Sequence, residues 1–191
     1  MEEENMESKK PLLVVFAGPN GSGKSTIVEH FGLLEGYTNA DDVVYSTEMT
    51  NYEAAQYVYE RRNKYLSELK NFSFETVLSS DYSMDIIRKA HENGYFIKCI
   101  FVLTKSPGLN AYRIRARVEQ GGHDVPEEKI YDRYDRSLDN IKELVQICDI
   151  LHIYDNTGEE PERIFRKHKE EDYKIFPNDS WNQDEILELI S

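Results

Sequence analysis

A glycine-rich octapeptide near the start constrains the fold of this chain more than any other feature. It reads Gly18-Pro19-Asn20-Gly21-Ser22-Gly23-Lys24-Ser25 and fits the phosphate-loop pattern G-x-x-x-x-G-K-[ST]. The apolar run 11–17 before it is typical of a buried parallel strand. Apolar residues recur after it at helical spacing, at Ile27, Val28, Phe31 and Leu34. Strand, loop and helix therefore follow one another in the order that a nucleotide-binding loop requires.

The chemistry of such a loop comes from its backbone. Glycines let successive N–H groups turn towards an anion, and the N-terminus of the following helix adds donors and a positive dipole end. We expect Lys24 to reach the β- and γ-phosphates of ATP, and the Ser25 hydroxyl to bind Mg²⁺. The alternative, a chance glycine-rich turn, is disfavoured because every fixed position matches in context. The residues predicted to bind ATP are Gly18, Pro19, Asn20, Gly21, Ser22, Gly23, Lys24, Ser25 and Thr26.

Downstream of the loop, strand patterns alternate with helical patterns. This alternation predicts an α/β chain with the three-layer α/β/α fold of nucleotide-kinase-like P-loop NTPases, a mainly parallel five-stranded sheet and a helical lid. In one predicted helix Arg62 interrupts the apolar stripe formed by Tyr52, Ala55, Tyr59, Leu66 and Leu69. The further strands are predicted over 37–42, 72–78, 95–104 and 149–155, and the further helices over 52–69, 83–93, 110–120 and 127–147.

The domain organisation follows from the same patterns. We expect residues 1–10 to be a disordered lead-in and residues 11–191 to form a single P-loop domain. Within that domain the lid covers about residues 105–140, and a hairpin and a closing helix occupy about residues 161–191. Ligands of parallel sheets bind at the carboxyl ends of the strands. These predicted ends coincide roughly with Gly18, Asp41 and Glu75.

Composition narrows the range of partners. The chain has 23 Lys and Arg against 36 Asp and Glu, a net charge of −13, so non-specific attraction to nucleic acid or an anionic membrane is disfavoured. Residues 1–10 lack the apolar core of a signal peptide, and no apolar run reaches the length of a membrane span. Two isolated cysteines, Cys99 and Cys148, are typical of reduced core residues in a cytoplasmic protein.

Two carboxylates are candidates for chemistry. Asp41 follows the predicted second strand, where it could take the proton of an attacking hydroxyl. The alternative is that Asn39, Asp41 and Asp42 cap the next helix, and the spacing favours neither. Glu75 interrupts an apolar strand and could bind a substrate hydroxyl or a water on Mg²⁺, whereas the alternative is a solvent-facing strand position.

Four arginines flank the predicted loop 121–126. Arg113 and Arg117 share one helix face, and Arg133 and Arg136 lie on the next helix. Two such helices would form a lid that brings positive charge onto phosphates as the site closes. His123 in the loop could contact phosphate or nucleotide. The alternative for any one of these arginines is pairing with Glu119, Asp132, Asp135 or Asp139 on a solvated face.

An ordered set of motifs resembles the zeta toxin family of P-loop kinases. The set consists of Ala17–Thr26, Asn39–Asp41, Phe74–Thr76, Arg113–Arg117, Gly121–Pro126 and Arg133–Leu138. The resemblance runs from about Leu12 to Asp155. It implies a kinase that uses ATP and Mg²⁺ to phosphorylate a hydroxyl of UDP-N-acetylglucosamine, and a possible antitoxin partner.

The resemblance also implies roles for individual residues. Asp41 would be the base, Glu75 and Thr76 would contact the substrate, and Arg117 would clamp phosphate. Toxin members place a second arginine where this chain has His123, so Arg133 or Arg136 would replace it. The chain is shorter than the characterised toxins, so another small-molecule kinase, acting for example on an antibiotic or a nucleoside, stays open. A nucleotide-binding regulator also stays open, although it would have no need of a base at Asp41.

Overall fold

The computed structural model describes residues 10–31, 34–122, 124–169 and 172–191. These residues form one six-stranded sheet in the order β2-β1-β3-β4-β5-β6. The first four strands are parallel, and β5 and β6 add an antiparallel hairpin at one edge. The strands are β1 (Leu12–Ala17), β2 (Phe72–Thr76), β3 (Phe96–Leu103), β4 (Ile150–Asp155), β5 (Glu162–His168) and β6 (Asp172–Ile175).

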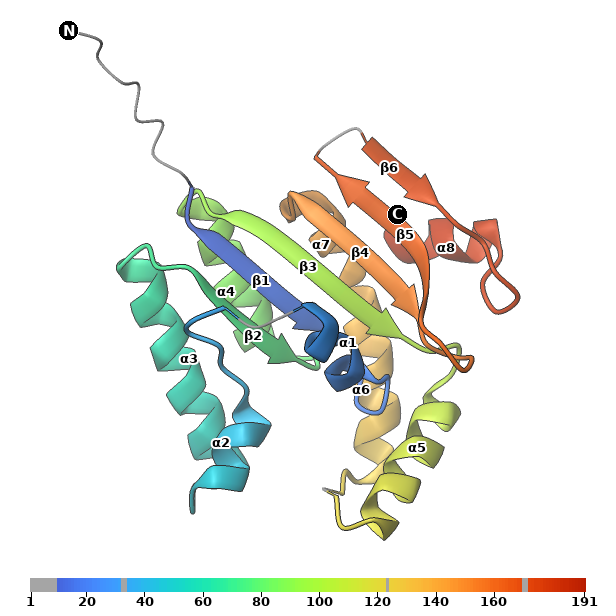
Figure 1. The fold of residues 1–191 in the computed structure, drawn as a ribbon, viewed down its shortest axis with the longest axis horizontal. Coiled ribbons are helices and arrows are strands. Elements are labelled where there is room, and N and C mark those ends of the chain that lie inside the picture. Colours follow the sequence, from blue (N-terminus) through green and yellow to red (C-terminus); the bar gives the residue numbers. More distant parts are fainter. Residues whose placement is uncertain (1–9, 32–33, 123, 170–171) are drawn as a thin grey trace, which may run out of the picture.

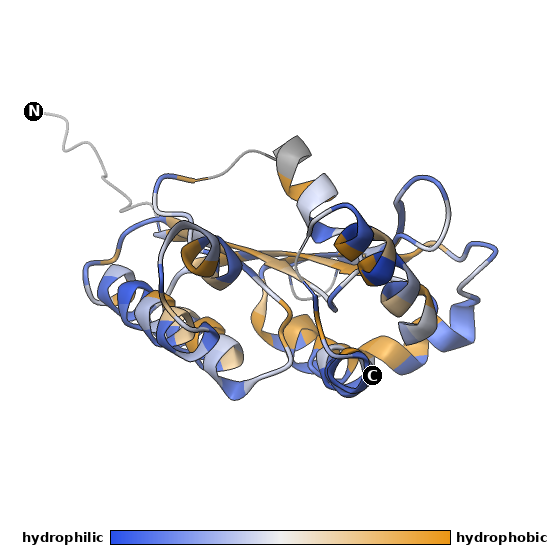
Figure 2. Ribbon diagram, turned by 90° about the horizontal axis from the view of Figure 1, so that it is seen from below, coloured by the Kyte–Doolittle hydropathy of each residue, from blue (hydrophilic) through white to orange (hydrophobic). Residues whose placement is uncertain are grey.

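Helices cover both faces of this sheet, and the expected three-layer P-loop fold is confirmed (Figure 1). Seen from the side, the sheet is a thin central layer between them (Figure 2). In the part of the chain that the structure describes, no helix is long and apolar enough to cross a membrane. The helices are α1 (Lys24–Phe31), α2 (Ala40–Ser46), α3 (Asn51–Ser67), α4 (Asp81–Glu92), α5 (Pro107–Glu119), α6 (Glu127–Asp139), α7 (Ile141–Ile147) and α8 (Gln183–Ile190).

The two faces of the sheet are packed differently. Alternate residues of β1 and β3, such as Val15 and Phe101, belong to a large core cluster that also includes residues of α4, α7 and α8. On the opposite face Phe16 and Ile100 pack with Ile27 of α1 in a smaller cluster. Because β1 and β3 are interior strands covered on both faces, the phosphate loop that follows β1 is attached to a tightly packed part of the sheet.

The predicted strand over 37–42 is wrong, so four of the five predicted strands are present in the structure. Thr38 makes a single isolated bridge to Phe74 beside β2. The chain then turns into α2, because the Asn39 side chain accepts a hydrogen bond from the Asp41 N–H and caps the helix. The other two of the six strands come from the hairpin, whose strands β5 and β6 extend the main sheet.

Two helix predictions also need correction. The buried face of α3 consists of Ala54, Val58, Arg62 and Leu66, whereas Tyr52 and Leu69 are exposed. The predicted single helix over 127–147 is two helices, α6 and α7, which meet at Asn140. The Asn140 side chain donates to the Leu78 carbonyl at 2.8 Å, which fixes the break against the end of β2. The lead-in 1–9 and His123 lie outside the described residues.

Candidate active site

Three glycines shape the phosphate loop. Gly18, Gly21 and Gly23 have φ angles of 140°, 76° and 89°, which other residues rarely adopt. A Cβ on Gly18 would lie 1.9 Å from the Val102 carbonyl oxygen, and a Cβ on Gly23 would lie 2.2 Å from the Asn156 amide nitrogen. The loop is therefore a cradle whose backbone is pressed against β3 and the β4–β5 loop, leaving its concave side for an anion.

Lys24, the first residue of α1, is buried at the base of this cradle. Its ammonium donates to the Pro19 carbonyl oxygen at 3.0 Å, so the side chain folds back along the loop. Burial lowers the pKa of Lys24, while the carboxylates of Glu75 and Asp41 act to raise it and Arg117 acts to lower it. The charges of Asp41, Glu75 and Arg117 are therefore near enough to the lysine to act on it electrostatically.

The loop can also hold a magnesium ion together with ATP phosphates. Ser25 and Thr26 are exposed at the start of α1, and the carboxylates of Asp41 and Glu75 act on the neighbouring Lys24. Hydroxyl and carboxylate oxygens are the donors that Mg²⁺ prefers, and it commonly takes one or two from protein and the rest from phosphate and water. Within the described ranges no cluster of three His, Cys, Asp or Glu side chains could hold a metal by itself. A phosphate-dependent Mg²⁺ site fits this arrangement.

Asp41 and Asp42 lie in the first turn of α2. Both residues are exposed overall. Partial burial of the Asp42 carboxyl raises its pKa, and the nearby charge of Asp41 raises it further. The N-cap is Asn39, not either aspartate, so the capping alternative accounts for Asn39 alone. The Asp41 carboxylate acts electrostatically on Lys24.

Glu75 lies near the end of β2, opposite Phe16 of β1. Burial raises its pKa, Lys24 counteracts this, and Asp41 raises it further. The Tyr37 hydroxyl donates to Glu75 Oε2 at 3.4 Å. Thr76 is committed differently, because its hydroxyl lies 2.7 Å from the Ser83 hydroxyl and accepts from the Leu78 N–H. Glu75 thus belongs to the charged group around Lys24, while Thr76 joins β2 to α4.

Two of the four predicted arginines approach the phosphate loop. Arg117, near the end of α5, is exposed and acts electrostatically on Lys24. Arg133 of α6 donates to the Asn20 side-chain oxygen within the loop at 3.4 Å. Helices α5 and α6 therefore lie next to the loop at the carboxyl end of the sheet (Figure 1).

The other two arginines lie elsewhere in the described structure. Arg113 donates to the carbonyl oxygens of Asn156 and Thr157, at 2.8 and 3.5 Å, and so holds the β4–β5 loop. Arg136 pairs with the Asp132 carboxylate one turn away on the exposed side of α6. Neither contact joins these arginines to Lys24 or Asp41.

Three residues that bear on the site were not predicted from the sequence. Asn156 donates to the Ser22 carbonyl oxygen at 2.7 Å and braces the phosphate loop. Tyr37 contacts Glu75, and Arg62 binds backbone oxygens at the base of the site. Only Arg62 gave a signal, as a charged residue on an apolar helix face. Asn156 follows a predicted strand, where a polar loop residue is common.

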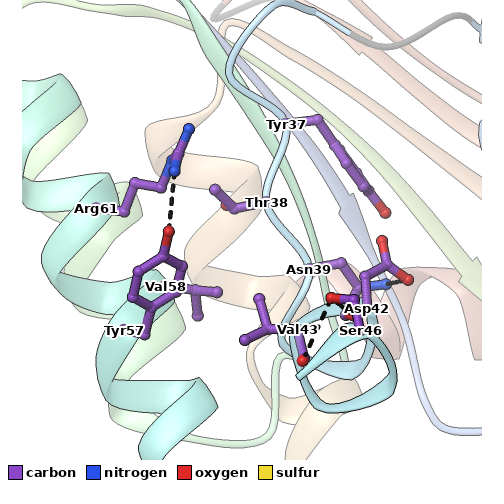
Figure 3. Close-up of a pocket in the computed structure, with 9 residues that line it drawn as sticks. All are labelled: Tyr37, Thr38, Asn39, Asp42, Val43, Ser46, Tyr57, Val58 and Arg61. Atoms are coloured by element: carbon purple, nitrogen blue, oxygen red, sulfur yellow. Dashed lines mark hydrogen bonds between the residues drawn. The ribbon is translucent and has the colours of Figure 1, made fainter. Parts of the chain in front are cut away.

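A pocket of about 240 Å³ lies between α2 and α3, beside the carboxylate end of the site. Figure 3 shows Tyr57 and Arg61 of α3 on one side of it and Asp42 of α2 on the other, with Tyr37 along the connecting segment. Its walls combine aromatic rings, a guanidinium, a carboxylate and an amide. The lining residues are Tyr37, Thr38, Asn39, Asp42, Val43, Ser46, Tyr57, Val58 and Arg61.

Comparison with known proteins identifies the family of this chain. The sequence matches the zeta toxin family over residues 35–170, well over half of the chain. This match begins after the phosphate loop, so the loop motif is independent evidence for a P-loop protein. An uncharacterized protein from Haemophilus influenzae is 25% identical over 127 residues, which cover 63% of this chain and 91% of that protein.

Solved structures agree on the fold. A chain of the AvrRxo1-ORF1:AvrRxo1-ORF2 complex solved with ATP has a TM-score of 0.69 and 15% identity, covering 96% of this chain and 64% of its own length. A chain of the PezAT chromosomal toxin-antitoxin system of Streptococcus pneumoniae has a TM-score of 0.61 and 20% identity, covering 83% of this chain and 73% of its own length. This chain thus spans less than two thirds of the AvrRxo1 chain. On the family match and the fold, this chain belongs to the zeta toxin family of P-loop kinases.

Proposed function

We propose that this protein transfers the γ-phosphate of ATP to a hydroxyl group of a small molecule. The observation that carries the proposal is the group of charges around Lys24. Two carboxylates, Asp41 and Glu75, and the guanidinium of Arg117 all act on an ammonium at the base of the phosphate loop. A protein that only binds nucleotide needs the loop and the lysine, but it has no use for a carboxylate facing them from α2.

The residues divide the reaction between them. The loop and Lys24 bind the phosphates, and Ser25 supports Mg²⁺, which neutralises phosphate charge when bound. Asp41 orients the acceptor hydroxyl and takes its proton as that oxygen forms a bond to the γ-phosphorus and the bond to the β-phosphate oxygen breaks. Arg117 and Arg133 stabilise the charge on the transferred group. Glu75 binds the acceptor.

The flanking segments have assignments of their own in this proposal. The loop and the helices over about residues 105–140 act as the lid, with Arg115 and Glu127 paired at 3.5 Å across the loop. The single kinase domain covers residues 11–191. Four further residues contact the acceptor or the phosphates only after the lid closes: Thr76, Arg113, Arg136 and His123. In the described structure Thr76, Arg113 and Arg136 form hydrogen bonds with other residues of the protein.

The family supports UDP-N-acetylglucosamine as the acceptor. One observation favours a second candidate, a smaller polar acceptor. The pocket lined by Asp42 has a volume of about 240 Å³, below the range of roughly 300–1,000 Å³ that is usual for drug-sized ligands. The chain is also shorter than the AvrRxo1 chain that it matches. A single polyhydroxylated ring would fit between the tyrosines and Asp42 better than a whole nucleotide sugar.

Partners follow from the relatives and from charge. The similar chains come from complexes named as a toxin-antitoxin system and as AvrRxo1-ORF1:AvrRxo1-ORF2, which supports an antitoxin partner for this chain. The net charge of −13 argues against nucleic acid as a partner. We assign the protein to the cytoplasm, where ATP is available and where its two cysteines, both free and buried, stay reduced.

The test is a magnesium-dependent ATP-consumption assay on the wild-type chain and on Asp41→Asn, with and without UDP-N-acetylglucosamine. We expect the sugar nucleotide to stimulate turnover of the wild type, and Asp41→Asn to lower that turnover by about 10²–10⁴-fold, the usual contribution of a general base. Affinity for a non-hydrolysable ATP analogue should change less than about threefold, because the base acts on the acceptor. Asp172→Asn, an exposed carboxylate on β6, is the matched control.

The outcomes separate the candidates. Stimulation by small polyols or monosaccharides, and not by the sugar nucleotide, would replace the first acceptor with the second. ATP-analogue binding by the wild type without turnover on any acceptor would contradict the kinase proposal. If Asp41→Asn lost nucleotide affinity together with activity, Asp41 would hold the metal or the fold and not the acceptor.

A further inference from the structure

Arg62 is a buried arginine that contacts the backbone of two segments, one that precedes Asp41 and one that contains Glu75. It lies on the core-facing side of α3, and only 5% of it is exposed. Its guanidinium carbon lies 4.1 Å from the centroid of the Phe74 ring. Arginines are rarely buried to this extent without an acidic partner, because removing the charge from water is costly.

Its hydrogen bonds end on uncharged oxygens of two separate chain segments. Nε donates to the Thr38 hydroxyl at 2.9 Å, and Nη2 donates to the Thr38 carbonyl at 3.2 Å. Nη2 also reaches the Glu75 carbonyl at 3.5 Å. The same Thr38 carbonyl accepts from the Glu75 N–H at 3.2 Å, so one backbone oxygen receives donors from both sides.

These two segments carry the proposed catalytic groups. Thr38 precedes Asn39, which caps the helix that begins with Ala40 and Asp41. Glu75 is the carboxylate that interacts with Lys24 and Tyr37. A continuous strand after Thr38 would have fixed this segment by a backbone ladder, but the structure has one isolated bridge there. The Arg62 guanidinium therefore supplies hydrogen bonds to this segment in place of the missing ladder.

We propose that Arg62 is a positioning residue that holds the Asp41 segment and the Glu75 end of β2 in register for phosphoryl transfer. The planar fork of an arginine can bind oxygens of two segments at once, whereas a lysine cannot hold them in one plane. Burial lowers the pKa of Arg62 to about 9, so the charge persists at neutral pH.

The proposal predicts that removing the Arg62 guanidinium weakens protection from hydrogen exchange only on the acceptor side of the active site. Arg62→Met keeps much of the apolar stem and removes the fork. We expect amides 37–46 to exchange with solvent roughly tenfold faster or more, as lost hydrogen bonds to a charged group imply, while amides of β1 and β3 stay unchanged. This readout needs no turnover. The second part rests on the proposed function: kcat should fall on the order of 100-fold through misplacement of the base, with the Kd for a non-hydrolysable ATP analogue within twofold.

Arg62→Lys is the second variant, because it keeps the positive charge and is less damaging to the fold. It should show the same local exchange and a smaller loss of kcat than the methionine variant. Arg88→Met is the matched control, since Arg88 of α4 forms a two-point contact with Glu143 away from the site. It should leave both the exchange of 37–46 and kcat unchanged.

The results can overturn the inference in two ways. Unchanged exchange over 37–46 in both Arg62 variants would show that Arg62 does not hold the segment. Exchange that rises equally in β1, β2 and β3, with kcat falling only in proportion to folded protein, would make Arg62 a stability residue. A wild-type chain that turns over no acceptor would instead sink the kinase proposal, and the exchange data would still decide whether Arg62 fixes the segment.

Discussion

The nucleotide side and the acceptor side of this active site are built in different ways. The phosphate loop is pressed against Val102 of β3 and is braced by Asn156. On the acceptor side, α2 carries Asp41 but has no buried residue, and it rests on α3 beside a pocket. The first region is fixed by the central sheet, and the second by a few side chains.

This difference has a physical consequence. A loop continuous with buried strands opens only when much of the domain unfolds, whereas a short helix with little buried surface can open locally at low cost. Nucleotide binding should therefore be insensitive to small changes, and acceptor positioning should be sensitive to single hydrogen bonds. Regions that must adapt to a substrate are drawn from the less stable parts of a fold.

The largest effect is expected where the loop meets the sheet. In Gly18→Ala the new Cβ would collide with the Val102 carbonyl oxygen, at a φ of 140° that alanine rarely adopts. We expect a loss of about 3 kcal/mol in the free energy of unfolding, which lowers the melting temperature by about 6–12 °C for a chain of this size. Thermal denaturation and titration with an ATP analogue measure both effects.

Gly158→Ala is the matched control, because its Cβ would meet nothing within 4 Å and its φ is unexceptional. It should change the melting temperature by less than about 2 °C, in line with ordinary surface substitutions. If Gly18→Ala were as stable as the wild type and bound nucleotide equally well, the loop would not be held by β3. The phosphate loop would then be no more firmly fixed than the acceptor side.

A smaller and more local effect is expected on the acceptor side. Asn39→Ala removes the cap of α2, which typically costs about 1 kcal/mol. Because α2 buries no residue, this loss should appear as roughly fivefold faster amide exchange in α2 and severalfold lower kcat, with little change in melting temperature. Hydrogen exchange resolved along the chain and steady-state kinetics provide the measurements.

The capping residue of α8 provides the comparison for that experiment. Asn182→Ala removes the same kind of cap from a helix that buries Ile186 and packs on the core. It should lower the melting temperature and leave kcat unchanged. Equal effects of the two substitutions on global stability would mean that α2 does not open independently.

The sequence predicted the nucleotide side well because its signals are local. The loop motif, the apolar strand before it and the helix after it occupy one continuous stretch, and the glycines report φ angles that the backbone requires. The central strand β3 was equally clear, since a strand buried on both faces is a continuous apolar run. The structure confirms β1 and β3 within one residue of the predicted bounds, and it confirms a helix, α1, directly after the loop.

The acceptor side was harder to predict because its geometry depends on contacts between distant residues. The segment after Gly36 has strand-like composition, but Asn39 caps a helix there. Arg62, 24 positions away from Thr38, donates to the Thr38 carbonyl, which also accepts from the Glu75 N–H. The apolar stripe predicted over 52–69 is in the wrong register, because its first and last residues, Tyr52 and Leu69, face solvent. Interactions across the fold, not local propensity, determine this region.

The smallest expected effect tests the contact between Tyr37 and Glu75. Burial raises the pKa of Glu75, and the Tyr37 hydroxyl, which donates to its carboxylate, acts in the opposite direction. Tyr37→Phe should therefore raise the pKa of Glu75 further, by a small amount because the hydrogen bond is long. The Glu75 carboxyl carbon, followed by NMR through a pH titration, reports this shift directly. The Tyr57 hydroxyl, on the other wall of the pocket, accepts a hydrogen bond from Arg61, so Tyr57→Phe should leave the Glu75 titration unchanged. If both substitutions shift it equally, the two walls are coupled, and the acceptor side is more rigid than the contrast with the phosphate loop implies.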